Sequence, residues 1–157
     1  MLDQLKELLE MQKALDEALM KEHGLTEYPL EKTKIALFTE LGEMMNELQT
    51  EFKWWKKHAT YNREKALVEY VDCLHFALSL ANHGKYEVID YDDYRMFDDV
   101  SNLSCYEILE SILEEYDECK FVRLFRLGNY FGFSWEEIYT TYKKKNEVNY
   151  ERLRSGY

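Results

Sequence analysis

Carboxylates recur at helical spacing in the stretch TELGEMMNELQTEF, residues 39–52. Glu40, Glu43, Glu47 and Glu51 lie three or four residues apart, so on a helix they share one side. Like charges at this spacing repel one another by roughly a few tenths of a kcal/mol per pair. Two interpretations explain why a helix would keep them together: a solvated acidic face, or a site for a cation.

A second pair of acids lies in apolar surroundings. The segment ALVEYVDCLHFALSLA, residues 66–81, is apolar on nearly every side of a helix, which predicts a buried helix. It nevertheless contains Glu69 and Asp72, three residues apart and pointing the same way. A buried carboxylate is paired, protonated or bound to a metal, because leaving it alone is costly. A buried ion pair with Lys or Arg is the alternative to a metal site here.

The two acidic pairs can face each other if consecutive helices pack side by side. Glu40 and Glu43 lie on the shoulder of the apolar arc of their helix, whereas a purely solvated stripe would lie opposite that arc. Carboxylate oxygens without Cys or His favour Mg²⁺, with Mn²⁺ as an alternative. The sequence therefore predicts Glu40, Glu43, Glu69 and Asp72 as metal ligands. Glu47 is a less secure member of the set, and Glu51 is expected to face solvent.

The composition predicts a single all-α domain, residues 1–157, that remains in the cytoplasm. Only six Gly and one Pro interrupt the chain, which favours helices. A net charge of −11 opposes binding to nucleic acid or to an anionic membrane. The three cysteines lack a CxxC spacing and indicate reduced thiols. Neither a signal peptide nor a membrane-spanning segment is expected.

Hydrophobic periodicity and capping patterns predict a helical bundle of about five to seven helices. Pro29 suits the first turn of the second helix. The sequences SCYE, from Ser104, and SWEE, from Ser134, match the capping box that begins a helix. Residues 86–102 are expected to form a loop that can include a short helix. The predicted helices are 2–22, 30–55, 63–82, 105–118, 119–130 and 135–150.

The acidic pairs resemble a known family pattern. Glu-x-x-Glu followed by Glu-x-x-Asp, here ELGE at residues 40–43 and EYVD at residues 69–72, resembles the all-α nucleoside triphosphate pyrophosphatases. That superfamily includes the MazG-like proteins and the dimeric dUTPases. The sequences FKWWKK, EYVDCLHFALSLAN and YKKKNEVNYERLRSGY look like the dimeric dUTPase branch. The resemblance runs from about residue 9 to the C-terminus and is weakest across residues 86–130.

This resemblance implies Mg²⁺-dependent hydrolysis of dUTP, and of dUDP, to dUMP, which keeps uracil out of DNA. Glu40, Glu43, Glu69 and Asp72 would hold the metals on the phosphates, and one of the glutamates would orient or deprotonate the attacking water. Clustered cations suit this chemistry because they neutralise the charge of a phosphoryl transition state. The resemblance also implies a homodimer.

The C-terminal helix is expected to bind the phosphates and the sugar. Its candidate residues recur at helical spacing and offer cationic and amide donors, which suit phosphate and sugar oxygens. A basic last turn that complements the helix dipole is the alternative for Lys143 and Lys144, but it explains the asparagines poorly. The resemblance adds the terminal tyrosine. The predicted set is Lys145, Asn146, Asn149, Arg152 and Tyr157.

Aromatic residues near the acids are candidates for uracil binding. Phe76 lies one helical turn after Asp72, and the resemblance implies that it stacks on uracil with His75 beside the base. Core packing and a satisfied core histidine are the respective alternatives. A second wall of the base pocket is expected from Phe52, Trp54 and Trp55, with core packing as the alternative for at least one of them.

Gln12 matches a glutamine that reads the base edge in this family. A side-chain amide both donates and accepts, which fits the alternating edge of uracil. Where relatives often carry Asn shortly after this glutamine, the present chain has Leu15 and Asp16. Rejecting thymine requires tight steric walls, since one methyl group gives only about 1–3 kcal/mol of discrimination.

Three other functions remain open on the sequence alone. The chain could be a house-cleaning pyrophosphatase for another nucleotide, such as dCTP or a damaged triphosphate, because the base pocket decides the substrate. A di-iron carboxylate bundle needs Glu-x-x-His on two helices, and the chain offers only Asp72-x-x-His75. A helical interaction protein without catalysis leaves Glu69 and Asp72 unexplained.

Overall fold

The computed structural model describes residues 1–84, 102–113 and 120–156. This part of the chain contains six α-helices and no strand, which confirms the predicted all-α helical bundle. The elements in chain order are α1 Leu2–Glu22, α2 Leu30–Glu47, the 3-10 helix η1 Gln49–Glu51, α3 Arg63–His83, α4 Cys105–Leu113, α5 Lys120–Tyr130 and α6 Trp135–Ser155.

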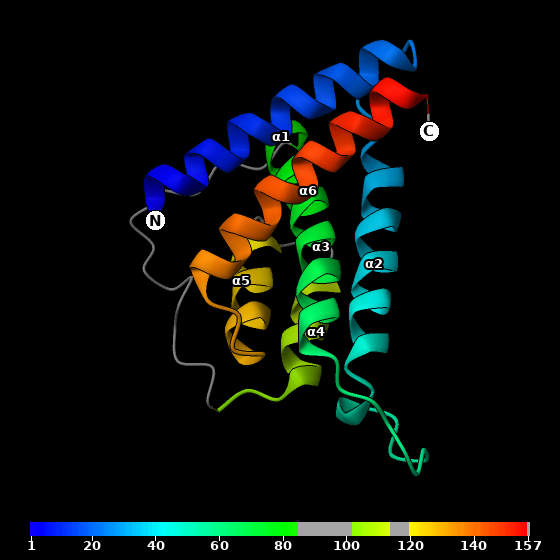
Figure 1. The fold of residues 1–157 in the computed structure, drawn as a ribbon, viewed down its shortest axis with the longest axis vertical. Coiled ribbons are helices and arrows are strands. Elements are labelled where there is room, and N and C mark those ends of the chain that lie inside the picture. Colours follow the sequence, from blue (N-terminus) through cyan, green and yellow to red (C-terminus); the bar gives the residue numbers. More distant parts are fainter. Residues whose placement is uncertain (85–101, 114–119, 157) are drawn as a thin grey trace.

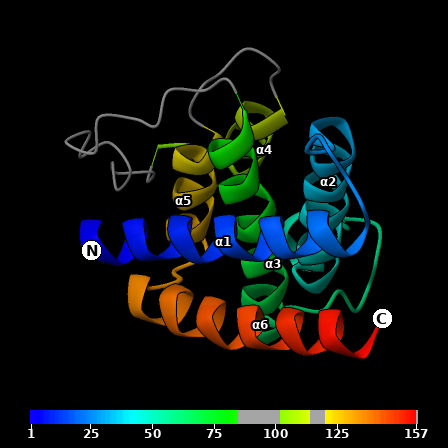
Figure 2. The ribbon, with the colours of Figure 1, turned by 90° about the horizontal axis from the view of Figure 1, so that it is seen from above.

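The central helix of the bundle is α3, and the other elements surround it (Figure 1). Helix α2 packs along the length of α3. Helix α5, with α4 against it, covers another side of α3. The two long helices α1 and α6 lie side by side and run in the same direction across α3 (Figures 1 and 2). Helices α1, α2, α3 and α6 therefore meet at the end of the bundle that holds the C-terminus.

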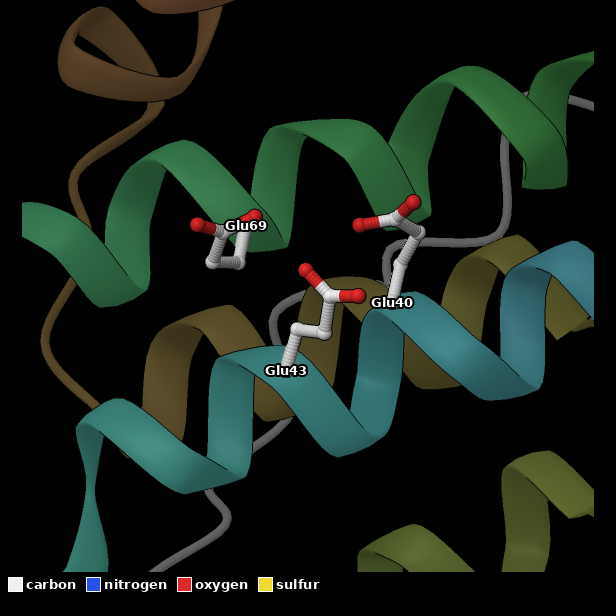
Figure 3. Close-up of side chains that lie close together, drawn as sticks. All are labelled: Glu40, Glu43 and Glu69. Carbon is white, nitrogen blue, oxygen red and sulfur yellow. The ribbon is translucent and has the colours of Figure 1, made fainter.

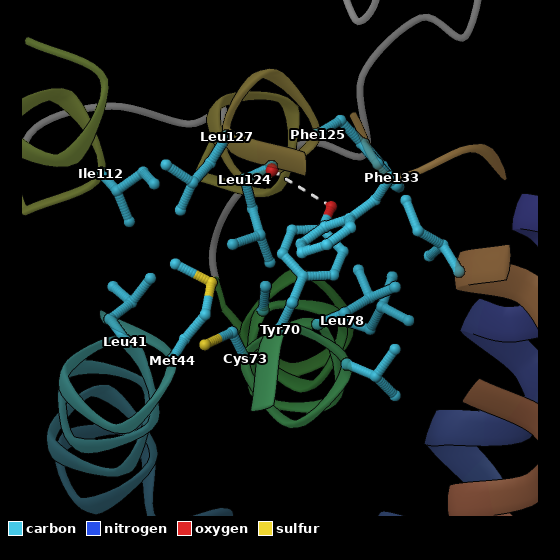
Figure 4. Packing of buried hydrophobic residues seen from close by; sticks show 14 of the residues in the cluster. Leu41, Met44, Tyr70, Cys73, Leu78, Ile112, Leu124, Phe125, Leu127 and Phe133 are labelled. Carbon is cyan, nitrogen blue, oxygen red and sulfur yellow. Dashed lines mark hydrogen bonds between the residues drawn. The ribbon is translucent and has the colours of Figure 1, made fainter. Parts of the chain in front are cut away.

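The core surrounds the inner face of α3 (Figure 4). Tyr70 is fully buried, and its hydroxyl donates a hydrogen bond of 3.1 Å to the carbonyl oxygen of Leu124 on α5. Gly128, one turn later on α5, makes this approach possible, since a Cβ there would lie 2.8 Å from the Tyr70 hydroxyl oxygen. Helices α3 and α5 are thus closely packed at Tyr70.

Both predicted capping boxes are confirmed. The backbone amide of Ser104 donates to Glu107 at 2.7 Å, and that of Ser134 donates to Glu137 at 2.8 Å. Glu137 has a second role, because Nη1 and Nη2 of Arg63 donate to its two carboxylate oxygens at 2.8 and 2.9 Å. Arg63 also donates to the carbonyl oxygen of Gly132 at 2.6 Å. This bidentate pair fixes the first turn of α3 to the first turn of α6.

The largest difference from the predicted elements is the end of α2. We expected this helix to continue to residue 55, but it ends at Glu47 and is followed by η1. The cause is pairing with a later segment: the amide of Asn62 donates to the carbonyl oxygen of Glu47 at 2.8 Å, and Leu48 bridges to Tyr61. Leu48 is fully buried by this turn. Residues 48–62 are consequently a closed loop instead of two more helical turns.

The other predicted boundaries differ less. The predicted helices 2–22, 63–82 and 119–130 agree with α1, α3 and α5 to within one residue, and Pro29 immediately precedes α2. The helix predicted over 135–150 continues to Ser155, where Gly156 with φ 70° ends it. Residues 114–119 and the predicted loop through residue 101 lie outside the described residues. No helix in the described ranges is long and apolar enough to span a membrane.

Candidate functional site

Three glutamates converge between α2 and α3 (Figure 3). Glu40 and Glu43 lie on one side of α2 and face Glu69 on the adjacent α3. One carboxylate oxygen from each of the three lies within 4.8 Å of the others. Glu40 and Glu69 are half-buried, and Glu43 is exposed. The antiparallel packing of consecutive helices therefore brings together three of the four predicted metal ligands.

The crowding of these carboxylates changes their proton affinities. Burial raises the pKa of Glu40 to about 7, and the negative charges of Asp72, Glu43 and Glu69 contribute, while Lys145 opposes the shift. Burial also raises the pKa of Glu69, followed by the charge of Asp72. Each acid therefore makes its neighbours harder to ionise, as expected where several carboxylates share one site. A cation in the cluster would remove this repulsion.

Asp72 has a different environment from the other three acids. Its Oδ2 accepts a hydrogen bond of 2.6 Å from Nζ of Lys145 on α6, and both side chains are mostly covered. Burial raises the pKa of Asp72, and the hydrogen bond from Lys145 opposes that shift. The ion pair that we considered as an alternative is therefore present for Asp72. It is absent for Glu69 among the residues that the structure describes.

The expectation that Glu69 and Asp72 are buried was wrong in degree. Both are only partly covered, since they lie on the side of α3 that faces the carboxylates of α2 and Lys145 of α6. The rest of α3 agrees with the expectation, because ten of its residues are buried, including Tyr70, Leu74 and Leu78. The sequence alone could not show that one narrow side of an apolar helix stays open to solvent.

A pocket of ≈ 460 Å³ begins at this acidic cluster and extends along α3. Glu40 and Asp72 lie at the acidic end, and His75, Phe76 and Ser79 follow at successive positions on α3. Helix α1 forms the opposite wall with Gln12, Leu15, Asp16 and Leu19, and α6 contributes Asn149, Arg152 and Leu153. The volume is within the range of small-molecule sites in proteins. The pocket thus joins a charged end to a partly apolar interior.

The predicted aromatic residues divide into two groups. Phe76 lines the pocket as expected for a residue that contacts a base. Phe52, Trp54 and Trp55 lie on the loop after η1, are 39%, 90% and 63% exposed, and do not line the pocket. They therefore do not form the predicted second wall here, and the alternative of core packing does not apply either, because the early end of α2 carries all three onto the surface.

The predicted residues of α6 are placed at three different positions. Lys145 is bonded to Asp72, as described above, while Asn149 and Arg152 line the pocket. Asn146 is only 4% exposed, and its Nδ2 has no hydrogen-bond partner among the described residues. Tyr157 lies outside the described residues. Of the predicted residues of α6, Asn149 and Arg152 thus reach the pocket, and Lys145 reaches the acidic residues beside it.

Gln12 lies at the centre of a buried hydrogen-bond network. Its Nε2 donates to Oδ1 of Asp16 at 2.8 Å and to Oγ of Ser79 at 2.9 Å. Its Oε1 lies 2.6 Å from Nδ1 of His75 and accepts from the hydroxyl of Tyr142 at 2.7 Å. Both ends of the amide are therefore fully used inside the protein.

The network continues to the far end of the pocket. Oγ of Ser79 donates to Oδ1 of Asp16 at 2.9 Å, and Nε2 of His83 lies 3.1 Å from Oδ2 of the same carboxylate. The ring of His83 stacks on Tyr28 with centroids 3.9 Å apart. Burial raises the pKa of Asp16, while the hydrogen bonds from Gln12 and Ser79 oppose the shift.

Four members of this network were not predicted from the sequence: Asp16, Ser79, His83 and Tyr142. A signal existed, because Gln12 and Asp16 are four residues apart on a predicted helix, as are His75 and Ser79 on another. Both pairs lie among apolar neighbours, so their polar atoms needed partners. That the two pairs bond to each other could not be deduced from spacing.

The acidic cluster fits a divalent metal ion. Three convergent carboxylates supply hard oxygen ligands, and Cys or His is absent from the cluster, which favours Mg²⁺ or Mn²⁺ over zinc. The pKa of Glu40 is raised first by burial and then by the neighbouring carboxylates, and a cation would relieve that second contribution. Glu40, Glu43 and Glu69 are therefore the residues that would hold it, with Asp72 beside them.

The helical bundle thus has an acidic cluster that fits a divalent metal ion, next to a pocket of small-molecule size. Comparison with known families agrees: a family model described as dUTPase matches residues 4–157, so the chain belongs to the all-α dUTPase family. Its activity is accordingly that of a dUTP diphosphatase. A search of curated proteins finds no match to this chain.

Proposed function

We propose that this chain hydrolyses dUTP, and also dUDP, to dUMP with Mg²⁺, and so keeps uracil out of DNA. The observation that carries the metal dependence is the convergence of Glu40, Glu43 and Glu69 next to the pocket, which Glu40 lines. The family match supports the nucleotide class. In the dUTP reaction, water attacks the α-phosphorus and the bond to the bridging oxygen of the β-phosphate breaks, which releases pyrophosphate.

The acidic residues position both the cation and the water in this proposal. Mg²⁺, or Mn²⁺ in its place, supplies charge neutralisation at the phosphates and lowers the pKa of a bound water. Glu40, Glu43, Glu69 and Asp72 hold it, and one of the glutamates orients the attacking water or accepts its proton. Lys145 lies beside Asp72 at 2.6 Å and is placed to move from that carboxylate to a phosphate oxygen.

In this proposal, different residues bind each part of the nucleotide. Asn149 and Arg152 of α6, with Asn146 and Tyr157, bind the phosphates and the sugar. Phe76 stacks on uracil, with His75 beside it, since both line the pocket beyond Asp72. Gln12 was expected to read the base edge, but its amide is already fully bonded inside the protein, so it acts on the base side only by holding His75. Phe52 and Trp55 are exposed and do not line the pocket in the free chain. Their loop must therefore move if they are to form the second wall around the base.

A homodimer completes the proposal. Two apolar side chains of α2, Ile35 and Phe38, are 64% and 41% exposed and lie three residues apart on one side of the helix. The substitution Ile35→Glu should convert a dimer to a monomer in sedimentation experiments, whereas the neighbouring exposed Lys32→Glu should not. A wild-type chain that sediments as a monomer would contradict the dimer. The cytoplasmic location stays a prediction from the cysteine pattern.

The decisive experiment measures pyrophosphate release from dUTP, dTTP, dCTP and UTP, and phosphate release from dUDP, with Mg²⁺ and with a chelator. We expect rapid, Mg²⁺-dependent turnover of dUTP and dUDP. Glu43→Gln should abolish it, whereas the matched control Glu51→Gln should not, because Glu51 lies on η1 outside the cluster. Preferred turnover of dCTP would keep the metal site and indicate a house-cleaning pyrophosphatase. No turnover with any substrate would favour a non-catalytic interaction protein.

A further inference from the structure

The buried network has one end whose hydrogen-bond polarity is fixed. Oδ1 of Asp16 accepts hydrogen bonds, so each group bonded to that oxygen must donate. Gln12 approaches Oδ1 of Asp16 at 2.8 Å, and Ser79 approaches the same oxygen at 2.9 Å. The amide of Gln12 must therefore turn its Nε2 toward Asp16, because the reversed amide would place two acceptor oxygens in contact.

That orientation determines the tautomer of His75. With Nε2 committed to Asp16, the Oε1 of Gln12 faces Nδ1 of His75 at 2.6 Å and the Tyr142 hydroxyl at 2.7 Å. An amide oxygen accepts only, so the proton of His75 lies on Nδ1. Burial, and secondarily the charge of Lys145, lowers the pKa of His75 to about 3, so the ring is neutral. Its Nε2 consequently carries a lone pair.

This lone pair has no partner within the described part of the chain. His75 is 4% exposed and its ring lines the pocket, yet Nε2 makes no hydrogen bond there. Asn146, also 4% exposed, has an unpartnered donor in its Nδ2. Asn146 follows Tyr142 by one turn of α6, and the Tyr142 ring stacks on His75 with centroids 4.0 Å apart. His75 thus brings an unused acceptor to the pocket, and Asn146 has an unused donor on α6, outside the residues that line the pocket.

We propose that Asp16 is a positioning residue that, acting through Gln12, fixes His75 as an acceptor and so makes the pocket select bases that carry a ring N–H. This inference rests on the proposed function and specifies its substrate class. A uracil ring presents an N–H that can donate to the lone pair on Nε2 of His75. The cytosine ring presents a lone pair and an amino group instead, so its lone pair would oppose that of His75. A site built for hydrogen bonding rejects a mismatched analogue strongly.

The substitution Asp16→Asn removes the fixed polarity with little change in shape. An asparagine offers both a donor and an acceptor, so the amide of Gln12 can reverse and His75 can carry its proton on Nε2. Glu17→Gln is the matched control. It also removes one negative charge, from the residue next to Asp16 on α1, and Glu17 is exposed. Ser79→Ala is a second control, because it removes hydrogen bonds of the network while the carboxylate remains.

Two measurements test the proposal together. Nitrogen NMR of the imidazole rings reports which His75 nitrogen is protonated in the free protein. The ratio of kcat/KM for dUTP to that for dCTP reports base selection. We expect the Nδ1–H tautomer in the wild type, in Glu17→Gln and in Ser79→Ala. In Asp16→Asn we expect a mixture of tautomers and a selectivity ratio at least about tenfold lower, with circular dichroism unchanged.

Two outcomes would overturn the proposal. An Nε2–H tautomer in the wild type would show that Asp16 does not set the polarity. An unchanged ratio in Asp16→Asn would show that the tautomer does not set base selection. A wild type that hydrolyses neither nucleotide would contradict the proposed function instead. Calorimetric binding of dUMP against dCMP would then replace the kinetic ratio, and the tautomer measurement would stand unaltered.

Discussion

The molecule contains two clusters of polar side chains that solve opposite problems. The acidic cluster of Glu40, Glu43 and Glu69 brings three carboxylates together where they are partly or fully exposed to solvent. The network around Gln12 is buried, and nearly every donor there meets an acceptor. Removing a carboxylate should therefore relieve the first cluster and damage the second. Charge alone does not predict the role of an acid; the partners around it do.

The largest expected effect is on catalysis and breaks the acidic cluster. Glu69→Gln should lower kcat/KM for dUTP by more than about 100-fold, because even residues outside the first shell of a metal cost about 10–100-fold. The same substitution should leave the fold intact or more stable, since it removes one of the crowded charges. Steady-state kinetics and thermal unfolding measure the two effects. Full activity in Glu69→Gln would remove this residue from the metal site.

A second substitution breaks the buried network. Asp16→Ala should lower the free energy of unfolding by about 1–3 kcal/mol, because buried donors of Gln12 and Ser79 lose their acceptor. Urea denaturation measures this change, with the exposed Glu17→Ala as the control. Equal stability of Asp16→Ala and the wild type would show that water or another group replaces the carboxylate.

The third prediction concerns pH in the metal-free protein. The pKa of Glu40 is raised from 4.5 to about 7, so between these values the folded chain binds more protons than the unfolded chain. Stability should therefore fall as the pH rises through this window, and the full cost should be present above it. Thermal unfolding in chelator from about pH 5 to about pH 8 measures the slope, part of which Glu40→Gln should remove. An identical slope in Glu40→Gln would assign the dependence to other acids.

The smallest expected effect sharpens the comparison. In chelator, Glu43→Gln should raise the free energy of unfolding by roughly a few tenths of a kcal/mol for each neighbouring carboxylate, since Glu43 is exposed and its repulsion is screened. Added Mg²⁺ should stabilise the wild type more than this variant, because the variant has lost a ligand. The control is Glu51→Gln, for which we expect no change in chelator.

The elements that could be predicted from sequence are those whose signals are local. Helix α3 follows from a long apolar segment, and the starts of α4 and α6 follow from Ser104 and Ser134, whose capping partners lie three residues away. The end of α2 could not be predicted, because residues 48–55 contain no Gly or Pro. Its cause is a contact with Tyr61 and Asn62, which no local pattern records.

The same distinction applies to the candidate site. The pairing of Glu40 and Glu43 with Glu69 followed from the i, i+3 spacings and one assumption, that consecutive helices pack together. The bond from Lys145 to Asp72 joins α6 to α3 and depends on tertiary geometry that spacing does not contain. The buried network is a further case, since its two halves lie on α1 and α3, more than sixty residues apart.

The ion pair between Arg63 and Glu137 has a consequence for how this chain can vary during evolution. Asp72 lies nine residues after Arg63 on α3, and Lys145 lies eight residues after Glu137 on α6. At about 1.5 Å per residue the two segments are nearly equal in length, so Lys145 meets Asp72 at the same height. Inserting one residue in either segment would rotate everything beyond it by about 100°. Lineages of this protein should therefore accept insertions in their loops but keep the lengths of these two helical segments constant.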